Sequence, residues 1–499
     1  MSEVKVYTIT TDLTVEDKKV YAASITYNQA INSYNSAELV HFNGPTADKT
    51  AIKASDKAVF DELAKRQRNQ FGQRKGPDAL LGLNINELGI IVFSGYVSNT
   101  TYSFSPYVIS YRSNMIDEFA LVDSIDCSIY GASTFADVSE EANTEYIYGK
   151  PPAENNWSIP KCLISIMEDM LQKGPEHWDG NEDMPEEETK ARNRQHQLNK
   201  KAFEKYVKPL LERSEETFGW KDRLQSMSGD CNNLDQDIML MLLNRLMEAS
   251  GHFMTVLLSI CEEFGCVLCP GPAIMPWDYY ITSRERIMEQ EEQVQLKVSS
   301  MHMSIGCETG TFPILYAAVI DKAGVGDTSA ENRVNNLPWM CYPEEGPDKA
   351  SEAGGSVLRV MPPSWYRDAP ESIDLPRDGS IEKETEEVDE GAVDKANDKM
   401  KQARKTYVDA RVTFMKDWAR INYLWHALAE STAEVTCPLT DDGVISVGKR
   451  YLVMDNQGVP LFRGFCSAVS CSVVSQGQQQ ALMQITFTHV ECGDFRLEN

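Results

Sequence analysis

Three cysteines near the middle of the chain have the spacing of a metal-binding loop. Cys261, Cys266 and Cys269 follow the Cys-x4-Cys-x2-Cys pattern of plant-type iron–sulfur loops, and Cys307 or Cys341 could supply a fourth ligand. The same thiols could hold a zinc ion. They are interleaved with apolar residues at the end of an apolar helical pattern, where free cysteine is a common core residue. We therefore expect buried thiols, and a metal or iron–sulfur enzyme that uses this cluster stays an alternative.

Other residues with catalytic potential form no recognisable motif. The histidines lie in no His-x-Glu or His-Glu-x-x-His arrangement, and the chain has no phosphate-binding Gly-Lys-Ser/Thr loop or Gly-x-Ser-x-Gly elbow. Carboxylate pairs such as Glu186-Glu187 lie in charge-dense runs that are typical of solvated faces. Aromatic and acidic residues at 277–280 could border a glycan cleft, but nothing fixes the carboxylate separation that hydrolysis needs. The sequence predicts no catalytic residue, no cofactor and no metal, and a protein that is not an enzyme.

The charge balance narrows the classes of partner. The 499 residues include 48 Lys and Arg against 75 Asp and Glu, which gives a net charge of −27. A surface this acidic repels phosphates, and the chain has no basic patch that could grip nucleic acid or an anionic membrane. The N-terminus has no secretion-signal pattern, and no apolar run reaches the ~18 residues that span a bilayer. The 12 cysteines are scattered, which favours reduced thiols over a disulfide framework.

Hydrophobic periodicity divides the chain into blocks of different character. Residues 1–150 alternate as strands around one short helical pattern, and residues 151–290 show helical periodicity. Strands return at 291–320, and an insertion over 321–391 ends in an acidic linker. Apolar residues at steps of three and four predict a long helix near 392–430, followed by strands to residue 499. This heptad pattern fits a coiled coil and an ordinary packed helix equally well.

A self-match is the most informative feature of the sequence. Residues 83–98 align without gaps to residues 452–467, with five of sixteen positions identical. Each copy combines a Gly-containing turn with a following strand of the pattern aromatic-x-Gly-aromatic. We expect the first glycine to adopt a left-handed turn and the second to mark a bulge or a close backbone approach. The residues that define this structural repeat are Leu83, Gly89, Phe93, Gly95 and Tyr96 in the first copy, and Leu452, Gly458, Phe462, Gly464 and Phe465 in the second.

A weaker match extends the repeat toward earlier strands. Residues 24–27 with Leu39 resemble residues 300–303 with Leu315 at the same separations. The second copy then combines 291–320 with 392–499, and the helical block 151–290 lies between the copies. Both copies have the order strand, helix, strand.

At these residues the sequence resembles baseplate or tail hub proteins of bacteriophages. The strand Val92-Phe93-Ser94-Gly95-Tyr96-Val97 resembles a strand of their tail-tube-like β-barrels, and residues 462–466 with the end strand 484–490 resemble a second such barrel. Cys466 departs from the valine that is usual there. The resemblance implies an α+β fold with two tube-like antiparallel β-barrel domains, at 1–150 and at 291–320 with 392–499. A large helical insertion and a long heptad-patterned helix complete the expected chain.

The resemblance also implies a function. Hub proteins assemble as homotrimers, so that two barrels per chain form a pseudo-sixfold ring that adapts a sixfold tail tube to a threefold spike or needle. The expected partners are a second copy of the chain, a tail tube protein, a central spike and other baseplate proteins. DNA would pass through the ring in transit only, and the protein, made in the host cytoplasm, would reside in the virion. A hub of a phage-like contractile injection or type VI secretion apparatus is the other alternative.

Overall fold

The structure is a computed structural model of the chain. It describes residues 9–15, 18–22, 24–42, 61–65, 80–85, 90–104, 109–130, 148–149, 158–175, 185–214, 234–249, 251–271, 278–289, 294–297, 305–308, 314–319, 340–344, 356–364, 413–427, 431–438, 445–455, 457–474 and 480–492. Several features expected from the sequence lie outside these residues: Gly89, residue 277, residues 300–303 of the weaker match, the acidic stretch at 371–390 and the first part of the long helix, 392–412.

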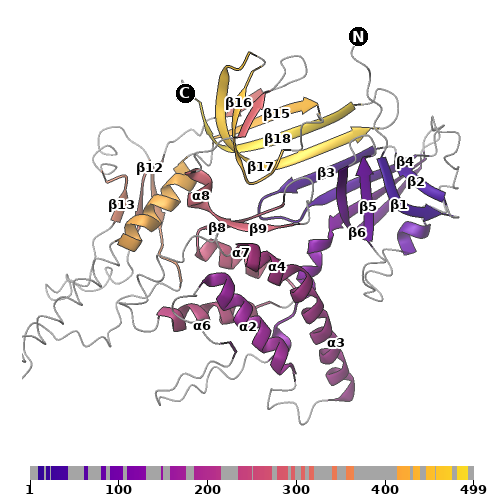
Figure 1. Ribbon diagram of the computed structural model, residues 1–499, viewed down its shortest axis with the longest axis horizontal. Coiled ribbons are helices and arrows are strands. Elements are labelled where there is room, and N and C mark those ends of the chain that lie inside the picture. The colour runs from indigo at the N-terminus through magenta and orange to yellow at the C-terminus, as the bar shows by residue number, and fades with distance from the viewer. Residues whose placement is uncertain are drawn as a thin grey trace, which may run out of the picture.

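One large sheet of 13 strands combines strands from both ends of the chain (Figure 1). Its N-terminal strands are β1 (Ile9–Val15), β2 (Lys18–Ala22), β3 (Ser24–Ala30), β4 (Ser36–Phe42), β5 (Leu80–Ile85), β6 (Ile90–Phe104) and β7 (Ile109–Asp117). Its C-terminal strands are β10 (Val294–Lys297), β11 (Ile305–Glu308), β15 (Thr432–Pro438), β16 (Arg450–Met454), β17 (Pro460–Val474) and β18 (Gln480–Glu491). The order is β11-β15-β18-β17-β3-β4-β7-β6-β5-β1-β2, with β16 also paired to β17 and β10 to β16.

Two groups of five strands within this sheet share one topology. The neighbours β3-β4-β7-β6-β5 and β11-β15-β18-β17-β16 have the same chain order, and every pair within each group is antiparallel. The long strands β6 and β17 each contain 15 residues. The groups are joined where β17 pairs antiparallel with β3. One hydrophobic core is shared by both groups and includes Phe93 and Phe462.

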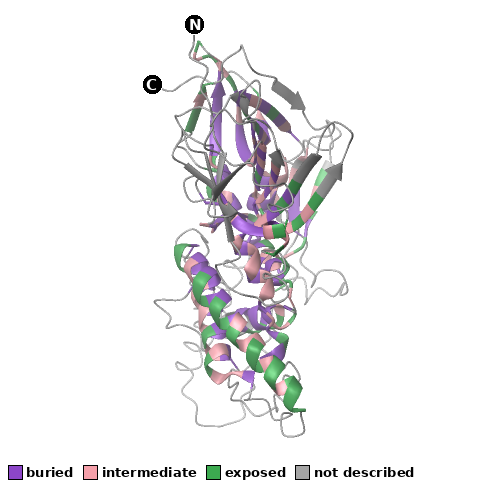
Figure 2. Cartoon of the chain, turned by 90° about the vertical axis from the view of Figure 1, so that its right-hand side faces the viewer, coloured by how far each residue is buried: buried purple, intermediate pink, exposed green. Residues whose placement is uncertain are grey.

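Helices form a second layer on one side of the large sheet (Figures 1 and 2). They are α2 (Ile159–Lys173), α3 (Glu186–Ala202), the π-helix η8 (Phe203–Val207), α4 (Lys208–Ser214), α6 (Leu234–Met247), α7 (Phe253–Glu263) and α8 (Arg284–Met288), with the 3-10 turns η2 (Glu118–Ser124) and η3 (Ser128–Tyr130). A two-stranded sheet, β8 (Cys266–Cys269) and β9 (Tyr280–Ser283), lies between the two layers. A three-stranded sheet contains β12 (Ile314–Val319), β13 (Met340–Tyr342) and β14 (Ser356–Val360).

Local sequence signals explain the boundaries of the helices. Helix α2 begins after Ser158, whose side chain accepts a hydrogen bond from the Lys161 amide at 3.3 Å, with Pro160 in the first turn. It ends at Gly174, whose φ of 71° is costly for other residues. Its apolar residues recur at helical spacing and are buried in the core of the helical layer. This layer therefore has its own hydrophobic core, separate from that of the sheet.

The fold agrees with the sequence in class and differs in several boundaries. The expected α+β class is confirmed, but the expected helical block 151–290 also contains β8 and β9. Among the described strands the large sheet ends at β11, because β12 pairs with β13 and β14 instead. The match of Leu39 with Leu315 is therefore wrong: Leu315 lies in β12, whereas strand order and register make Leu39 equivalent to Val435.

The helices also differ between the two groups. The described part of the long C-terminal helix, residues 413–427, comes before β15 in the chain. The short helix 61–65 instead comes after β4, which is the strand equivalent to β15. The two groups thus share their strands but not the position of the helix in the chain. Among the helices of the described residues, none is long and apolar enough to cross a membrane.

Candidate functional site

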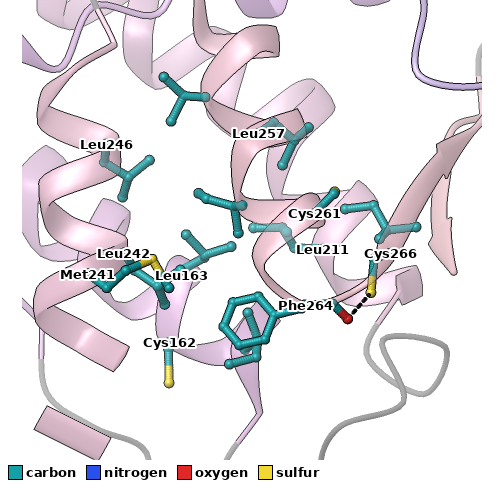
Figure 3. Packing of buried hydrophobic residues seen from close by; sticks show 14 of the residues in the cluster. Cys162, Leu163, Leu211, Met241, Leu242, Leu246, Leu257, Cys261, Phe264 and Cys266 are labelled. Carbon is teal, nitrogen blue, oxygen red and sulfur yellow. Dashed lines mark hydrogen bonds between the residues drawn. The ribbon is translucent and has the colours of Figure 1, made fainter. Parts of the chain in front are cut away.

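The cysteines with metal-loop spacing do not converge on one point. Cys261 and Cys266 lie in the core of the helical layer, where the Cys266 thiol donates to the Phe264 carbonyl at 3.4 Å (Figure 3). Cys269 belongs to a different cluster, with Trp425 and other residues. Cys266 and Cys269 are three residues apart on β8, and alternate strand residues point to opposite faces. Within the described residues, no group of three His, Cys, Asp or Glu side chains could hold a metal ion.

Burial also sets the protonation state of these thiols. It raises the pKa of Cys261 and of Cys269 to about 12, and that of Cys266 well above its ordinary value. The thiols are therefore protonated at neutral pH, whereas nucleophilic attack needs a thiolate. Their position and pKa suit core packing.

The aromatic and acidic residues at 278–280 do not form a glycan cleft. Asp278 forms an ion pair with Arg213 at 3.4 Å. Tyr279 is fully buried and its hydroxyl donates to Asp117, and burial raises the pKa of Tyr280 far above its ordinary value. The contact of Tyr279 with Asp117 connects the segment before β9 to the end of β7 in the large sheet.

The two long strands carry bulges at positions that the sequence match makes equivalent. In the pairing of β5 with β6 the additional residue is Val92, and in the pairing of β16 with β17 it is Leu461. In the pairing of β6 with β7 it is Ser98, and in the pairing of β17 with β18 it is Ser467. Val92 aligns with Leu461, and Ser98 with Ser467, in the same ungapped match. Each bulge bends its strand and increases the local twist.

The two bulge serines make the same hydrogen bond. Ser98 Oγ donates to the carbonyl of Asn114 at 2.9 Å, and Ser467 Oγ donates to the carbonyl of Thr486 at 3.2 Å. In each case the acceptor is the residue that pairs with the strand position directly after the bulge. The equivalence therefore extends from the backbone to a specific side chain.

We expect Ser98→Ala and Ser467→Ala to lower the free energy of unfolding by similar amounts, about 1 kcal/mol each, because each removes a hydrogen bond to the backbone of the neighbouring strand. Urea denaturation followed by circular dichroism measures both values. Ser470→Ala is the matched control on β17, since its hydroxyl makes no hydrogen bond among the described residues, and it should cost less. A loss confined to one of the two serines would contradict the equivalence.

Three of the four repeat glycines, Gly95, Gly458 and Gly464, lie in the described residues. A Cβ added to Gly95 would lie 2.1 Å from the carbonyl oxygen of Ile116, and one added to Gly464 would lie 3.0 Å from Cβ of Phe487. Both strands therefore need glycine for close contact with the neighbouring strand. Gly458 has a φ of 81° in the turn before β17, which is the left-handed conformation expected there.

The aromatic residues on either side of these glycines point to opposite faces. Phe93 and Phe462 are buried in the shared core of the sheet. Tyr96 instead interacts with Tyr206 of η8, and Phe465 packs against Trp425 of the helix 413–427 with ring centroids 5.7 Å apart. The second aromatic residue of each motif therefore attaches a helix to the other face. The two leucines of the match have different partners: Leu83 lies opposite Phe93, whereas Leu452 is buried opposite Arg463, so the register of the first strand differs by one residue between the copies.

Sequence reasoning missed the junction between the two groups. β17 contacts β3 through seven residue pairs from Ala468↔Ala30 to Val474↔Ser24, and Thr26 Oγ1 donates to Ser472 Oγ at 3.3 Å. Tyr27 lies opposite Cys471, and burial together with this thiol raises the pKa of Tyr27 well above its ordinary value. Alternation of apolar and polar residues predicts each strand, but it carries no information on which distant strand is its neighbour.

Comparisons with known proteins give matches to solved structures at low similarity. No family model and no curated protein matches the sequence. Among solved structures, a tail protein from Neisseria meningitidis has 10% identity and a TM-score of 0.39, with 97% of each chain covered. A prophage MuSo2 tail protein from Shewanella oneidensis has 11% identity and a TM-score of 0.41, covering 97% of this chain and 100% of the other.

A third solved structure comes from a secretion system. It is an Escherichia coli component of the type VI secretion system, described as structurally similar to the T4 bacteriophage tail proteins gp27 and gp5. Its identity is 6% and its TM-score 0.35, with 96% of this chain and 76% of the other covered.

Proposed function

We propose that the chain is a structural subunit of a phage tail or baseplate, and specifically its hub. Three copies would place six related strand groups around a channel, join a sixfold tail tube to a threefold spike, and let DNA pass. The observation that carries this proposal is the pair of strand groups with one topology and bulges at equivalent positions. Two equivalent units in one chain give a trimer six equivalent faces, which is what a sixfold partner requires.

The proposal assigns a role to each part of the chain. The first unit corresponds to the expected barrel of residues 1–150, and the second to β10, β11 and the strands after residue 431. The ten repeat residues, from Leu83 to Phe465, shape the walls of these units. The helical layer would contact other baseplate proteins. An excess of acidic residues suits a channel for DNA in transit, because it repels phosphate.

No catalytic step enters the proposal. The buried thiols pack in hydrophobic cores and Asp278 is ion-paired with Arg213, so the hub acts through its surfaces as part of the virion. A hub of a type VI secretion apparatus would use the same surfaces. The two settings would differ in the tube and spike proteins that bind.

The test is the oligomeric state of the purified chain and its binding to tube protein. Native mass spectrometry should give the mass of three chains, and class averages from electron microscopy should show six similar units around a central opening. Adding the cognate tube protein should produce stacked rings. A stable monomer at high concentration that forms no ring with tube protein would overturn the proposal.

A further inference from the structure

One edge of β6 has no neighbour among the described strands. β5 pairs with β6 only as far as Tyr96, while β7 covers the opposite edge up to Phe104. In β17 the equivalent half is covered, because β3 pairs with Ala468–Val474 there. The second half of β6 is thus equivalent to residues 468–474 of β17, which already pair with β3 at the junction between the two groups.

The strand that would complete this edge is also present in the chain. β11 and β3 are equivalent strands, because β11 is the neighbour of β15, β3 is the neighbour of β4, and β15 and β4 have the same place in their groups. β3 uses its second edge to bind β17, whereas β11 is the end of the large sheet among the described strands. A sheet edge with free amide and carbonyl groups is a template for strand addition.

Register makes the equivalence residue-specific. Thr100 of β6 and Val469 of β17 are equivalent when the ungapped match is extended, and Cα partners can be followed from each of them across the neighbouring strands. In the first group the partners in order are Thr100, Ser113, Leu39 and Ile25. In the second group they are Val469, Ile485, Val435 and Ile305. Ile305 is therefore equivalent to Ile25. In the existing junction Ile25 lies opposite Val473, and Val473 is equivalent to Phe104.

We propose that β11 of one copy pairs antiparallel with the second half of β6 of another copy, in the register of the β3–β17 junction. The resulting pairs are Phe104 with Ile305, Ser103 with Gly306, Tyr102 with Cys307 and Thr101 with Glu308. This inference rests on the proposed ring, and it names the surface that closes it. Each copy has one donor strand and one acceptor edge, so the contact is head-to-tail and generates a ring when its rotation closes.

The residue types at the centre of this register support it. The existing junction places a tyrosine of β3 opposite a cysteine of β17, Tyr27 with Cys471. The proposed junction places a cysteine of β11 opposite a tyrosine of β6, Cys307 with Tyr102. Both junctions thus pair one tyrosine with one cysteine, but the tyrosine lies on β3 in the first and on β6 in the second. The combined side-chain volume of the pair is therefore the same in both. An exchange of this kind is expected where two strands must fit each other.

Disulfide trapping tests the pairing directly. Residues directly opposite in antiparallel strands have Cα atoms about 4.5–5.5 Å apart, within the range that a disulfide bridges. We expect Tyr102→Cys, together with native Cys307, to give covalent dimers and trimers under mild oxidation, and peptide mass spectrometry should identify the 102–307 link. Adding Cys307→Ser should abolish the link. Ser103→Cys, one position along and opposite Gly306, should give no more covalent oligomer than the parent protein.

Two further variants keep the test decisive. Tyr27→Cys, opposite native Cys471, should form a link within one chain and shows that the oxidation conditions trap such pairs. Should Tyr102→Cys fail to fold, the double variant Thr101→Cys with Glu308→Cys probes the adjacent pair, and Thr101 is exposed. A trimer without either link would overturn the pairing and leave the hub proposal standing. A link within a single chain would also overturn it, and a monomer that forms no ring would overturn the hub proposal itself.

Discussion

Replacing Gly95 with alanine is expected to lower the free energy of unfolding by about 3 kcal/mol or more. The added methyl group would lie 2.1 Å from the Ile116 carbonyl oxygen and 2.8 Å from Cα of Asp117, both of them backbone atoms of β7. A flexible side chain could move away from this contact, but β7 is held between β6 and β4. Relief therefore requires moving two strands apart. Urea denaturation followed by tryptophan fluorescence and circular dichroism measures the loss.

The chain offers two matched controls for this substitution. Gly464→Ala changes the equivalent position, where the nearest atom is Cβ of Phe487 at 3.0 Å, a side-chain atom, and we expect a smaller loss. Gly458→Ala meets no atom within 4 Å and incurs only the strain of a left-handed backbone, about 1 kcal/mol. The expected order of destabilisation is Gly95, then Gly464, then Gly458. A loss for Gly95→Ala no larger than that for Gly458→Ala would show that β7 moves freely.

The repeat and its glycines could be predicted from sequence because they depend on local rules. A left-handed turn and a close strand contact both require glycine, so the pattern aromatic-x-Gly-aromatic remained recognisable in two copies that are otherwise divergent. The same locality explains why residues 151–290 were predicted as a helical block, which is where α2 to α8 lie. The class of the fold follows from such periodicities alone.

The remaining features depend on contacts between distant segments. The cysteine spacing suggested a metal loop, but Cys266 and Cys269 lie on the same strand and point to opposite faces of it. The spacing of residues in the sequence does not show in which direction their side chains point. The weaker match failed at Leu315 because an insertion separates β11 from β15, and short strands carry too little pattern to fix their register. The buried contact of Asp117 with Tyr279 had no local signal, since the two residues are far apart in sequence.

Asp117 is a carboxylic acid buried where the two layers meet. It ends β7, and its Oδ2 accepts hydrogen bonds from the Asn35 amide at 3.0 Å and from the Tyr279 hydroxyl. The Tyr279 ring stacks on Phe119, with ring centroids 4.3 Å apart. Burial raises the pKa of Asp117 to about 7, and the hydrogen bonds from Tyr279 and Asn35 offset only part of the effect. The folded protein therefore holds a proton on this group that the unfolded chain loses near its ordinary pKa.

The sign of the pH dependence follows from this upward shift. Because the folded-state pKa exceeds the unfolded value of 3.8, the stability that protonation contributes is fully present below pH 4 and is lost as the pH rises through about 7. Asp117→Asn keeps a neutral acceptor at all pH values and lacks this loss. We expect the unfolding free energy of Asp117→Asn, relative to the parent, to rise by on the order of 4 kcal/mol between pH 4 and pH 8.

Urea titrations of both proteins between pH 4 and pH 8.5 measure this difference, and the comparison cancels the titration of all groups they share. Glu38→Gln removes one negative charge from an exposed pair with Arg112 and should give a nearly constant difference from the parent over the same range. A flat difference for Asp117→Asn would mean that water reaches the carboxylate in solution. A difference that rises only above pH 4 and levels off near pH 8 would identify Asp117 as the group that makes the contact between the layers sensitive to neutral pH.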